Sequence, residues 1–162
     1  MTTEEGAGLL DSIRKFFRDH ASRDTGLDEA ATAERARVAA AALLVEVVKS
    51  DNEFTLGDRK AVLEAAQRTF DLDGEAARKL VQLAELEADA APGLYPFTSL
   101  INSVFTPEQK VQLVEELWRV AWSDDTLHRY EEHVIRKVAD LIYVPHSAFI
   151  AAKLRVQDAR DT

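Results

Sequence analysis

The stretch VVKSDNEFTLGDRKAV, residues 47–62, joins the apolar end of one expected helix to the start of another. A second stretch, VAWSDDTLHRYEEHVI, residues 120–135, repeats its order of apolar helix end, Ser-Asp pair and acid-led helix. Asp51 aligns with Asp124 at an offset of 73 residues, 124 less 51. Residues 50–58 and 123–131 are called the first and second acidic joints below. Because the same offset also aligns the flanking residues, the chain contains an internal repeat.

The repeat extends well beyond the joints. At the same offset of 73, Leu44 pairs with Leu117 and both fall on the apolar stripe of a helix. The alignment predicts two copies, over about residues 38–81 and 111–154, each with three helices and an acidic joint between the first two. If the copies pack about a pseudo-twofold axis, their joints lie near one another.

The composition favours helices along the whole chain. Only 4 prolines and 6 glycines occur among 162 residues, whereas Ala, Leu, Glu and Arg recur, and these four are good helix formers. The length suits one domain of ordinary size. We therefore expect an all-α fold, a single domain over residues 1–162 with about seven or eight helices, in two similar halves of three to four helices.

Capping residues and breaks set the expected helix bounds. Thr55 and Asp58 stand in the relation of a capping box, and Thr106 with Gln109 forms a second such start around Pro107. The segment APGLYPF breaks the chain between the two halves. The helices expected from these signals and from apolar spacing cover about residues 4–20, 28–50, 56–70, 73–89, 97–104, 106–122, a segment through 134–141, and 147–156. The first is amphipathic, and its ordinary length favours packing against its own domain over a membrane.

The joints carry more acid than helix capping needs. One acid in a helix's first turn stabilises it by about 0.3–1 kcal/mol, and further acids add repulsion. A divalent cation would relieve that repulsion, so the joints predict a metal site. The residues expected as primary ligands are Asp51, Asp58, Asp124 and Glu131, and the secondary ones are Glu53, Asp125, Glu132 and His128.

The donor set indicates which ions suit such a site. Carboxylate oxygens favour the hard ions calcium and magnesium. His128 lies four residues after Asp124 and four before Glu132, which leaves zinc or manganese open. Neither joint is an EF-hand loop, because the sixth position from Asp51 is Leu56 where that loop has glycine.

A second interpretation of the joints needs no metal. The acids then only cap helices and present a negative face, and the protein is an acidic interaction or adaptor module. We expect no enzyme activity and no organic cofactor, because the sequence has neither a glycine-rich phosphate loop nor a GxSxG motif and its 4 histidines are scattered.

Charge and hydropathy narrow the partners. A formal net charge of −9 disfavours nucleic acid and anionic lipid. No run of about 18 apolar residues is present, so we expect no stable membrane insertion. The lack of cysteine fits a reducing compartment, and we expect a cytoplasmic protein. A protein partner or a homodimer stays open.

The two joints also resemble a known family. SDNEFTLGD, residues 50–58, and SDDTLHRYE, residues 123–131, look like the paired acidic motifs of the tellurite-resistance TerB-like family. The resemblance implies an all-helical fold of two similar halves and an acidic surface that binds a divalent metal in bacterial stress response. Carried over by position, its turn aspartate matches Asp51 and Asp124, and its helix-start acid matches Asp58 and Glu131. The chain departs from the family where Ser-Asp-Asn and Ser-Asp-Asp replace the common Ala-Asp-Gly.

Overall fold

The computed structural model of the chain describes residues 29–49, 54–123 and 129–161. Within these ranges the protein is all-helical, as expected, with seven helices and no strand. The expected helix over residues 4–20 lies outside them. The described helices are α2 (Glu29–Lys49), α3 (Leu56–Phe70), α4 (Gly74–Ala90), α5 (Tyr95–Val104), α6 (Pro107–Ala121), α7 (Arg129–Leu141) and α8 (His146–Asp161).

Three of the predicted helix starts, those of α3, α4 and α6, are confirmed. The Thr55 hydroxyl accepts a hydrogen bond from the Asp58 amide at 3.0 Å, and the Asp58 carboxylate accepts one from the Thr55 amide at 3.0 Å. Thr106 and Gln109 make the same reciprocal pair at the start of α6. Asp73 caps α4 by accepting from the Ala76 amide at 2.8 Å. These side chains satisfy amides that a helix start leaves without intrahelical partners.

Two helix bounds differ from the prediction. Helix α5 begins at Tyr95, before the expected residue 97, and Pro96 lies inside its first turn. Proline is tolerated there because the first-turn amides have no intrahelical acceptor. Helix α8 continues to Asp161, beyond the expected residue 156, and Arg160 on this added turn donates a hydrogen bond to the Trp122 carbonyl at 2.7 Å.

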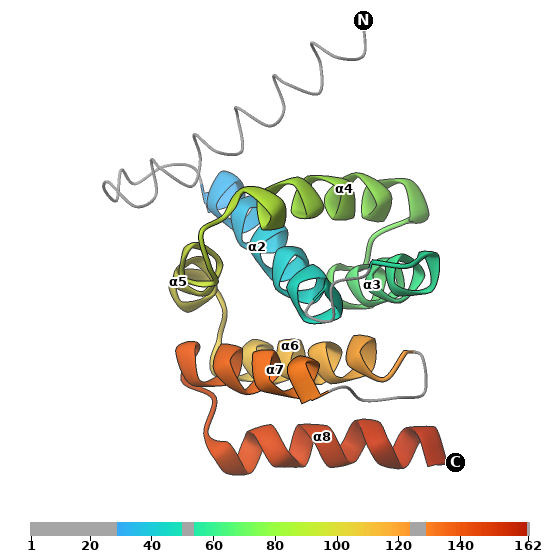
Figure 1. The fold of residues 1–162 in the computed structure, drawn as a ribbon. Helices are drawn as coiled ribbons and strands as arrows, with labels where there is room; N and C mark the ends of the chain where they lie inside the picture. Colours follow the sequence, from blue (N-terminus) through green and yellow to red (C-terminus); the bar gives the residue numbers. More distant parts are fainter. Residues whose placement is uncertain (1–28, 50–53, 124–128, 162) are drawn as a thin grey trace, which may run out of the picture.

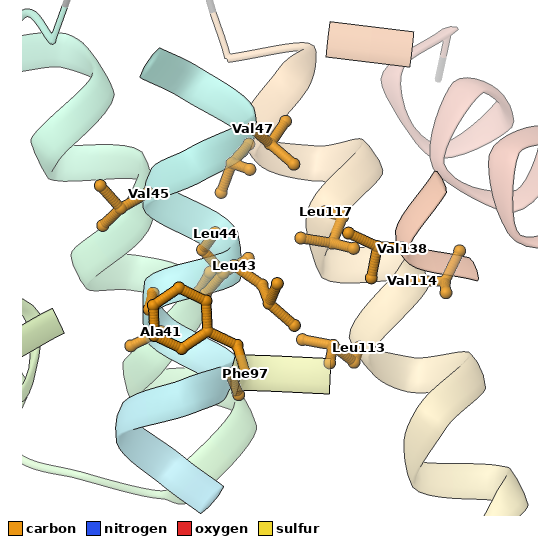
Figure 2. Close-up of a cluster of buried hydrophobic side chains, with 14 of the residues drawn as sticks. Ala41, Leu43, Leu44, Val45, Val47, Phe97, Leu113, Val114, Leu117 and Val138 are labelled. Atoms are coloured by element: carbon orange, nitrogen blue, oxygen red, sulfur yellow. The ribbon is translucent and has the colours of Figure 1, made fainter. Parts of the chain in front are cut away.

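Helix α2 forms the centre of the molecule. It contacts α3, α4, α5, α6 and α7, and Figure 1 shows it crossing between the α3–α4 pair and the remaining helices. Its apolar side chains point to opposite sides of the helix. In Figure 2, Val45 points toward one side of α2, while Leu43 and Val47 point toward Leu113 and Leu117 of α6. A helix buried around its whole circumference must be apolar on every face, which explains the run of alanine, leucine and valine in α2.

Buried side chains from all seven described helices form one core cluster. Phe97 of α5 is fully buried and lies beside Ala41 of α2 (Figure 2). Trp118 of α6 is also fully buried, and the centre of its ring lies 5.2 Å from the centre of the Phe149 ring in α8. Phe149 thus joins α8 to the core, since α8 makes its main packing contacts with α6.

The second helices of the two copies, α3 and α7, bury equivalent residues at the offset of 73. Val62 of α3 and its counterpart Ile135 of α7 are both fully buried. The copies differ at the ends of these helices. The left-handed residues near these ends, Asp71 and Tyr143, are 72 apart (143 less 71), one less than the offset of 73.

Candidate functional site

Three of the eight predicted ligands lie in the described part of the chain: Asp58, Glu131 and Glu132, each in the first turn of α3 or α7. The other five fall outside the described residues, which exclude 50–53 and 124–128. They are Asp51, Glu53, Asp124, Asp125 and His128. The structure therefore describes only the residues at the ends of the two joints.

Asp58 already has a structural role at the first joint. One of its carboxylate oxygens, Oδ2, accepts the Thr55 amide at 3.0 Å as part of the capping box. Its side chain is half-buried. A carboxylate has two oxygens and about four acceptor positions, so the other oxygen keeps capacity for a further partner.

The two acids of the second joint differ in environment. Glu131 is buried, with 4% of its surface exposed. Glu132 is half-buried and accepts a hydrogen bond from the Lys153 ammonium of α8 at 3.2 Å. A buried carboxylate is costly unless it is paired or hydrogen-bonded. Glu131 is therefore the member of the described set that depends most on its surroundings.

A cavity of about 280 Å³ lies between α3 and α6 and connects the two joints. Gly57, in the first turn of α3, and Ser123, just after α6, both contribute to its wall. These residues belong to the first and second joint respectively, so the ends of the joints approach one another. We call this space the α3–α6 cavity; its lining is Gly57, Lys60, Ala61, Glu64, Arg68, Arg119, Val120 and Ser123.

A buried glutamate holds two arginines of the cavity wall in place. Glu116 of α6 accepts hydrogen bonds from Arg68 Nε at 3.3 Å and Arg68 Nη2 at 2.8 Å. It also accepts one from Arg119 Nη1 at 2.9 Å. The bonds to Glu116 raise the pKa of the Arg68 guanidinium above its ordinary value, although partial burial acts to lower it. This Arg-Glu-Arg cluster fixes α3 against α6.

The donor set of the joints suits a hard divalent cation, but the described acids do not complete a site. No group of three His, Cys, Asp or Glu side chains that could hold a metal occurs among residues 29–49, 54–123 and 129–161. The α3–α6 cavity itself is lined by three cations, Lys60, Arg68 and Arg119, which repel a metal ion. A cation bound by the acids of the joints would therefore lie outside this cavity.

The first joint also borders a second pocket, of about 580 Å³, between the end of α2, the start of α3 and α4. Phe54 of this joint is half-buried and packs against the core. The Arg59 guanidinium lies 5.1 Å from the centre of its ring and pairs with Glu85 at 2.7 Å. The corresponding Leu127 of the second joint lies outside the described residues.

The charges at this pocket are paired across helices. Lys49 at the end of α2 forms an ion pair with Asp89 of α4. One turn earlier on α2, burial raises the pKa of Glu46 above its ordinary value; Lys49 acts to lower it and Asp89 to raise it further.

Sequence patterns did not identify Glu116 as a site residue. Its contact with Arg68 joins positions 48 apart, and no local spacing indicates such a pair. One signal was present in the repeat: at the offset of 73, Glu116 aligns with Leu43, which is fully buried in α2. An acid that replaces a buried leucine of the other copy needs a partner, and here the partners are Arg68 and Arg119.

Comparison with known proteins gives one match. The model of a family described as tellurite resistance protein TerB matches residues 37–154. This range includes both joints and every described helix at least in part. No curated protein and no solved structure matches the chain significantly. Of the helices that the structure describes, none has the length and apolar character needed to cross a membrane.

Proposed function

The chain belongs to the family of tellurite resistance protein TerB, and from this premise we propose that it binds a divalent metal ion through its two acidic joints. The primary ligands in this proposal are Asp51, Asp58, Asp124 and Glu131, with the other four predicted residues as secondary ligands. Calcium or magnesium is favoured by the oxygen donors. The role would be in bacterial stress or tellurite response, in the cytoplasm and without a catalytic step.

The observation that carries the proposal is the shared wall of the α3–α6 cavity. Gly57 is the neighbour of Asp58, and Ser123 is the neighbour of Asp124. Gly57 and Ser123 line one cavity, so the described ends of the two joints border the same space. A cation shared between the joints requires that their acids converge, and a pseudo-twofold arrangement of the two copies would produce such convergence.

One feature of the described acids fits a cation bound at the joints. Asp58 uses Oδ2 for the capping box, so its Oδ1 is the atom that would bind metal. The Lys60, Arg68 and Arg119 side chains would exclude the ion from the cavity itself.

Titration calorimetry on the full chain tests this proposal. Calcium, magnesium, manganese and zinc chlorides are titrated separately into the metal-free protein at constant ionic strength. Saturable binding of at least one ion is expected, and the double variant Asp51→Asn plus Asp124→Asn should abolish it. Absence of saturable heat with all four ions would overturn the proposal.

A matched control separates ligation from loss of charge. Asp140 and Asp158 are exposed acids of α7 and α8 outside the joints, so Asp140→Asn plus Asp158→Asn removes the same charge by the same chemistry. This variant should bind metal as the parent does. An equal loss of binding in both double variants would show a diffuse effect of net charge and contradict a site at the joints.

An acidic interaction module is the second candidate, and the capping box favours it. Asp58 is engaged in holding the start of α3, and Glu132 is engaged with Lys153. Both acids therefore have a structural role that needs no metal. In this case the joints would present a negative face to a basic protein partner, and metal binding would be absent.

The two candidates predict different responses to a chelator. A partner isolated on the immobilised full chain should stay bound in EDTA if the acids act by charge alone, and it should be lost with Asp51→Asn plus Asp124→Asn. A partner that is released by EDTA and restored by added calcium or magnesium would favour the metal site instead.

A further inference from the structure

The α3–α6 cavity concentrates positive charge in an acidic protein. Lys60, Arg68 and Arg119 contribute to its lining against one acid, Glu64, in a chain whose net charge is −9. A recess lined mainly by one sign of charge raises the local concentration of ligands of the opposite sign. We propose that this cavity binds a small inorganic oxyanion of the phosphate class.

The two arginines are held in place before any ligand arrives. Glu116 accepts hydrogen bonds from both guanidiniums. Its side chain is only 8% exposed, so little of its negative charge faces the solvent from which an anion would enter. A guanidinium has five N–H donors; Arg68 uses two of its nitrogens on Glu116 and Arg119 uses one. Donors fixed in position lose less conformational entropy when an anion binds.

Lys60 supplies a third cation that is not neutralised by a described acid. It is exposed on α3, and it takes no part in the described ion pairs of the cavity wall. Arg68 and Arg119, by contrast, share Glu116, and Arg119 also pairs with Glu115 at 3.6 Å. Lys60 is therefore the residue whose positive charge is most available to an anion at the cavity mouth.

The start of α3 adds neutral donors to the same wall. Gly57 lies in the first turn of α3, where the helix dipole favours negative charge; the next amide, that of Asp58, already bonds the Thr55 hydroxyl. Ser123, whose side chain is a hydroxyl donor, lies on the opposite wall. Together with the cations, these groups surround the cavity with hydrogen-bond donors from two helices.

The volume of the cavity suits a small anion. At about 280 Å³ it lies near the lower end of the range of about 300–1,000 Å³ that is usual for pockets binding organic ligands. A phosphate ion with some of its water fits this space, and the inferred ligand is accordingly an inorganic oxyanion.

This inference goes beyond the proposed metal site and does not depend on it. The cations of the cavity would hold the oxyanion, whereas the acids of the two joints would hold a metal ion. Binding measured in EDTA reports the oxyanion site alone, so a failure here and a failure of the metal proposal can be told apart.

The test is a titration of the ¹⁵N-labelled full chain with potassium phosphate in EDTA, followed by NMR, with potassium chloride at matched ionic strength as the reference. Saturable shifts of the Gly57, Ala61 and Ser123 amide signals are expected with phosphate and not with chloride. Uniform, unsaturated shifts with both salts would overturn the proposal.

Variants at Lys60 assign the binding to the cavity. Lys60→Ala should weaken phosphate binding by about tenfold, the effect of losing one charge-assisted contact, while Lys60→Arg should largely retain it. Lys137→Ala removes an exposed lysine of α7 outside the cavity and should leave the affinity unchanged. Thermal unfolding checks that all three variants fold. Equal affinities for Lys60→Ala and Lys137→Ala would contradict the assignment.

Discussion

The Arg68 guanidinium of α3 donates two hydrogen bonds to the Glu116 carboxylate of α6, from Nε at 3.3 Å and from Nη2 at 2.8 Å. Arg119 adds a third bond to the same carboxylate, at 2.9 Å. The Glu116 side chain is 8% exposed, whereas those of Arg68 and Arg119 are 47% and 39% exposed. Two partly solvated cations thus converge on one desolvated anion, and the contact joins the two copies of the repeat.

Replacing Glu116 by glutamine should destabilise the protein. The amide keeps the shape of the side chain but leaves two guanidiniums close together without their counter-charge. Hydrogen bonds to charged groups contribute about 1.5–3 kcal/mol, and the solvent exposure of the arginines reduces this. We expect a loss of about 1–3 kcal/mol in the free energy of unfolding, measured by urea denaturation followed by circular dichroism.

The matched control is Glu108→Gln on the same helix. Glu108 is exposed, and surface substitutions of this kind usually change stability by less than about 0.5 kcal/mol. If Glu116→Gln were no more destabilising than Glu108→Gln, the Arg-Glu-Arg cluster would not be a significant link between α3 and α6.

Glu46 should make the stability depend on pH. Burial raises the pKa of its carboxyl above the ordinary value, with Lys49 opposing and Asp89 reinforcing the shift. A carboxyl whose pKa is raised on folding binds its proton more tightly in the folded state. Its contribution to the free energy of unfolding therefore falls as the pH rises from the ordinary glutamate pKa through the raised one, and levels off above that.

The variant Glu46→Gln removes this titration. Its melting temperature relative to the parent protein should increase as the pH rises through that window and then stay constant to neutral pH. Scanning calorimetry from pH 4 to 8 measures the difference, with Glu108→Gln as the reference for losing one exposed negative charge. A difference that decreases with rising pH would show that attraction to Lys49 outweighs desolvation.

Tyr143 is a site where the protein can be stabilised. Its φ angle is 62°, a left-handed conformation that costs a non-glycine residue about 1–2 kcal/mol. The Tyr143 amide bonds the Asp140 carbonyl and the Val144 amide bonds the Ala139 carbonyl, the pattern of a Schellman motif, which prefers glycine at this position. The ring is 78% exposed and lies 5.8 Å from the Lys110 ammonium.

Tyr143→Gly should therefore raise the free energy of unfolding by up to about 1 kcal/mol, because relief of the backbone conformation exceeds the loss of an exposed cation–π contact. Tyr143→Ala is the control, since it removes the ring but keeps the unfavourable backbone angle. Urea denaturation of both variants should rank glycine above tyrosine and alanine at or below it. The reverse order would indicate that the ring makes the larger contribution.

Local chemistry predicted most of the fold, and long-range pairing could not be predicted. Capping boxes at Thr55 and Thr106 determined where α3 and α6 begin, because a cap is made by residues three apart in sequence. The wall of the α3–α6 cavity depends on Arg68 meeting Glu116, 48 positions away, which no periodicity encodes. The extra turn of α8 likewise follows from a tertiary contact, between Arg160 and the Trp122 carbonyl.

For the acids of the joints, the sequence predicted which residues belong together but not what they do. Asp58 was expected both to cap α3 and to bind metal, and the capping role is confirmed. Five of the eight predicted ligands lie outside the described residues. The metal role of Asp58 therefore needs an experiment that separates the charge of its side chain from its capping hydrogen bond.

The variant Asp58→Asn separates the charge of this side chain from its capping hydrogen bond. Its amide oxygen can still accept the Thr55 amide, so Asp58→Asn should lower the free energy of unfolding by no more than about 0.5 kcal/mol, since asparagine and aspartate cap about equally well. Its lost negative charge should weaken calcium or magnesium binding by about tenfold or more if Asp58 is a ligand. Urea denaturation and titration calorimetry measure the two effects on the same sample.

Thr55→Ala is the reciprocal variant, because it removes the capping hydroxyl and keeps the Asp58 carboxylate. It should lower the free energy of unfolding by about 1 kcal/mol and leave the metal affinity of the folded protein nearly unchanged. Thr106→Ala at the matching capping box of α6 should cost a similar amount of stability. If Asp58→Asn instead leaves both stability and metal affinity as they were, Asp58 caps α3 and takes no part in a metal site, and the cation would have to be held by the remaining acids of the joints.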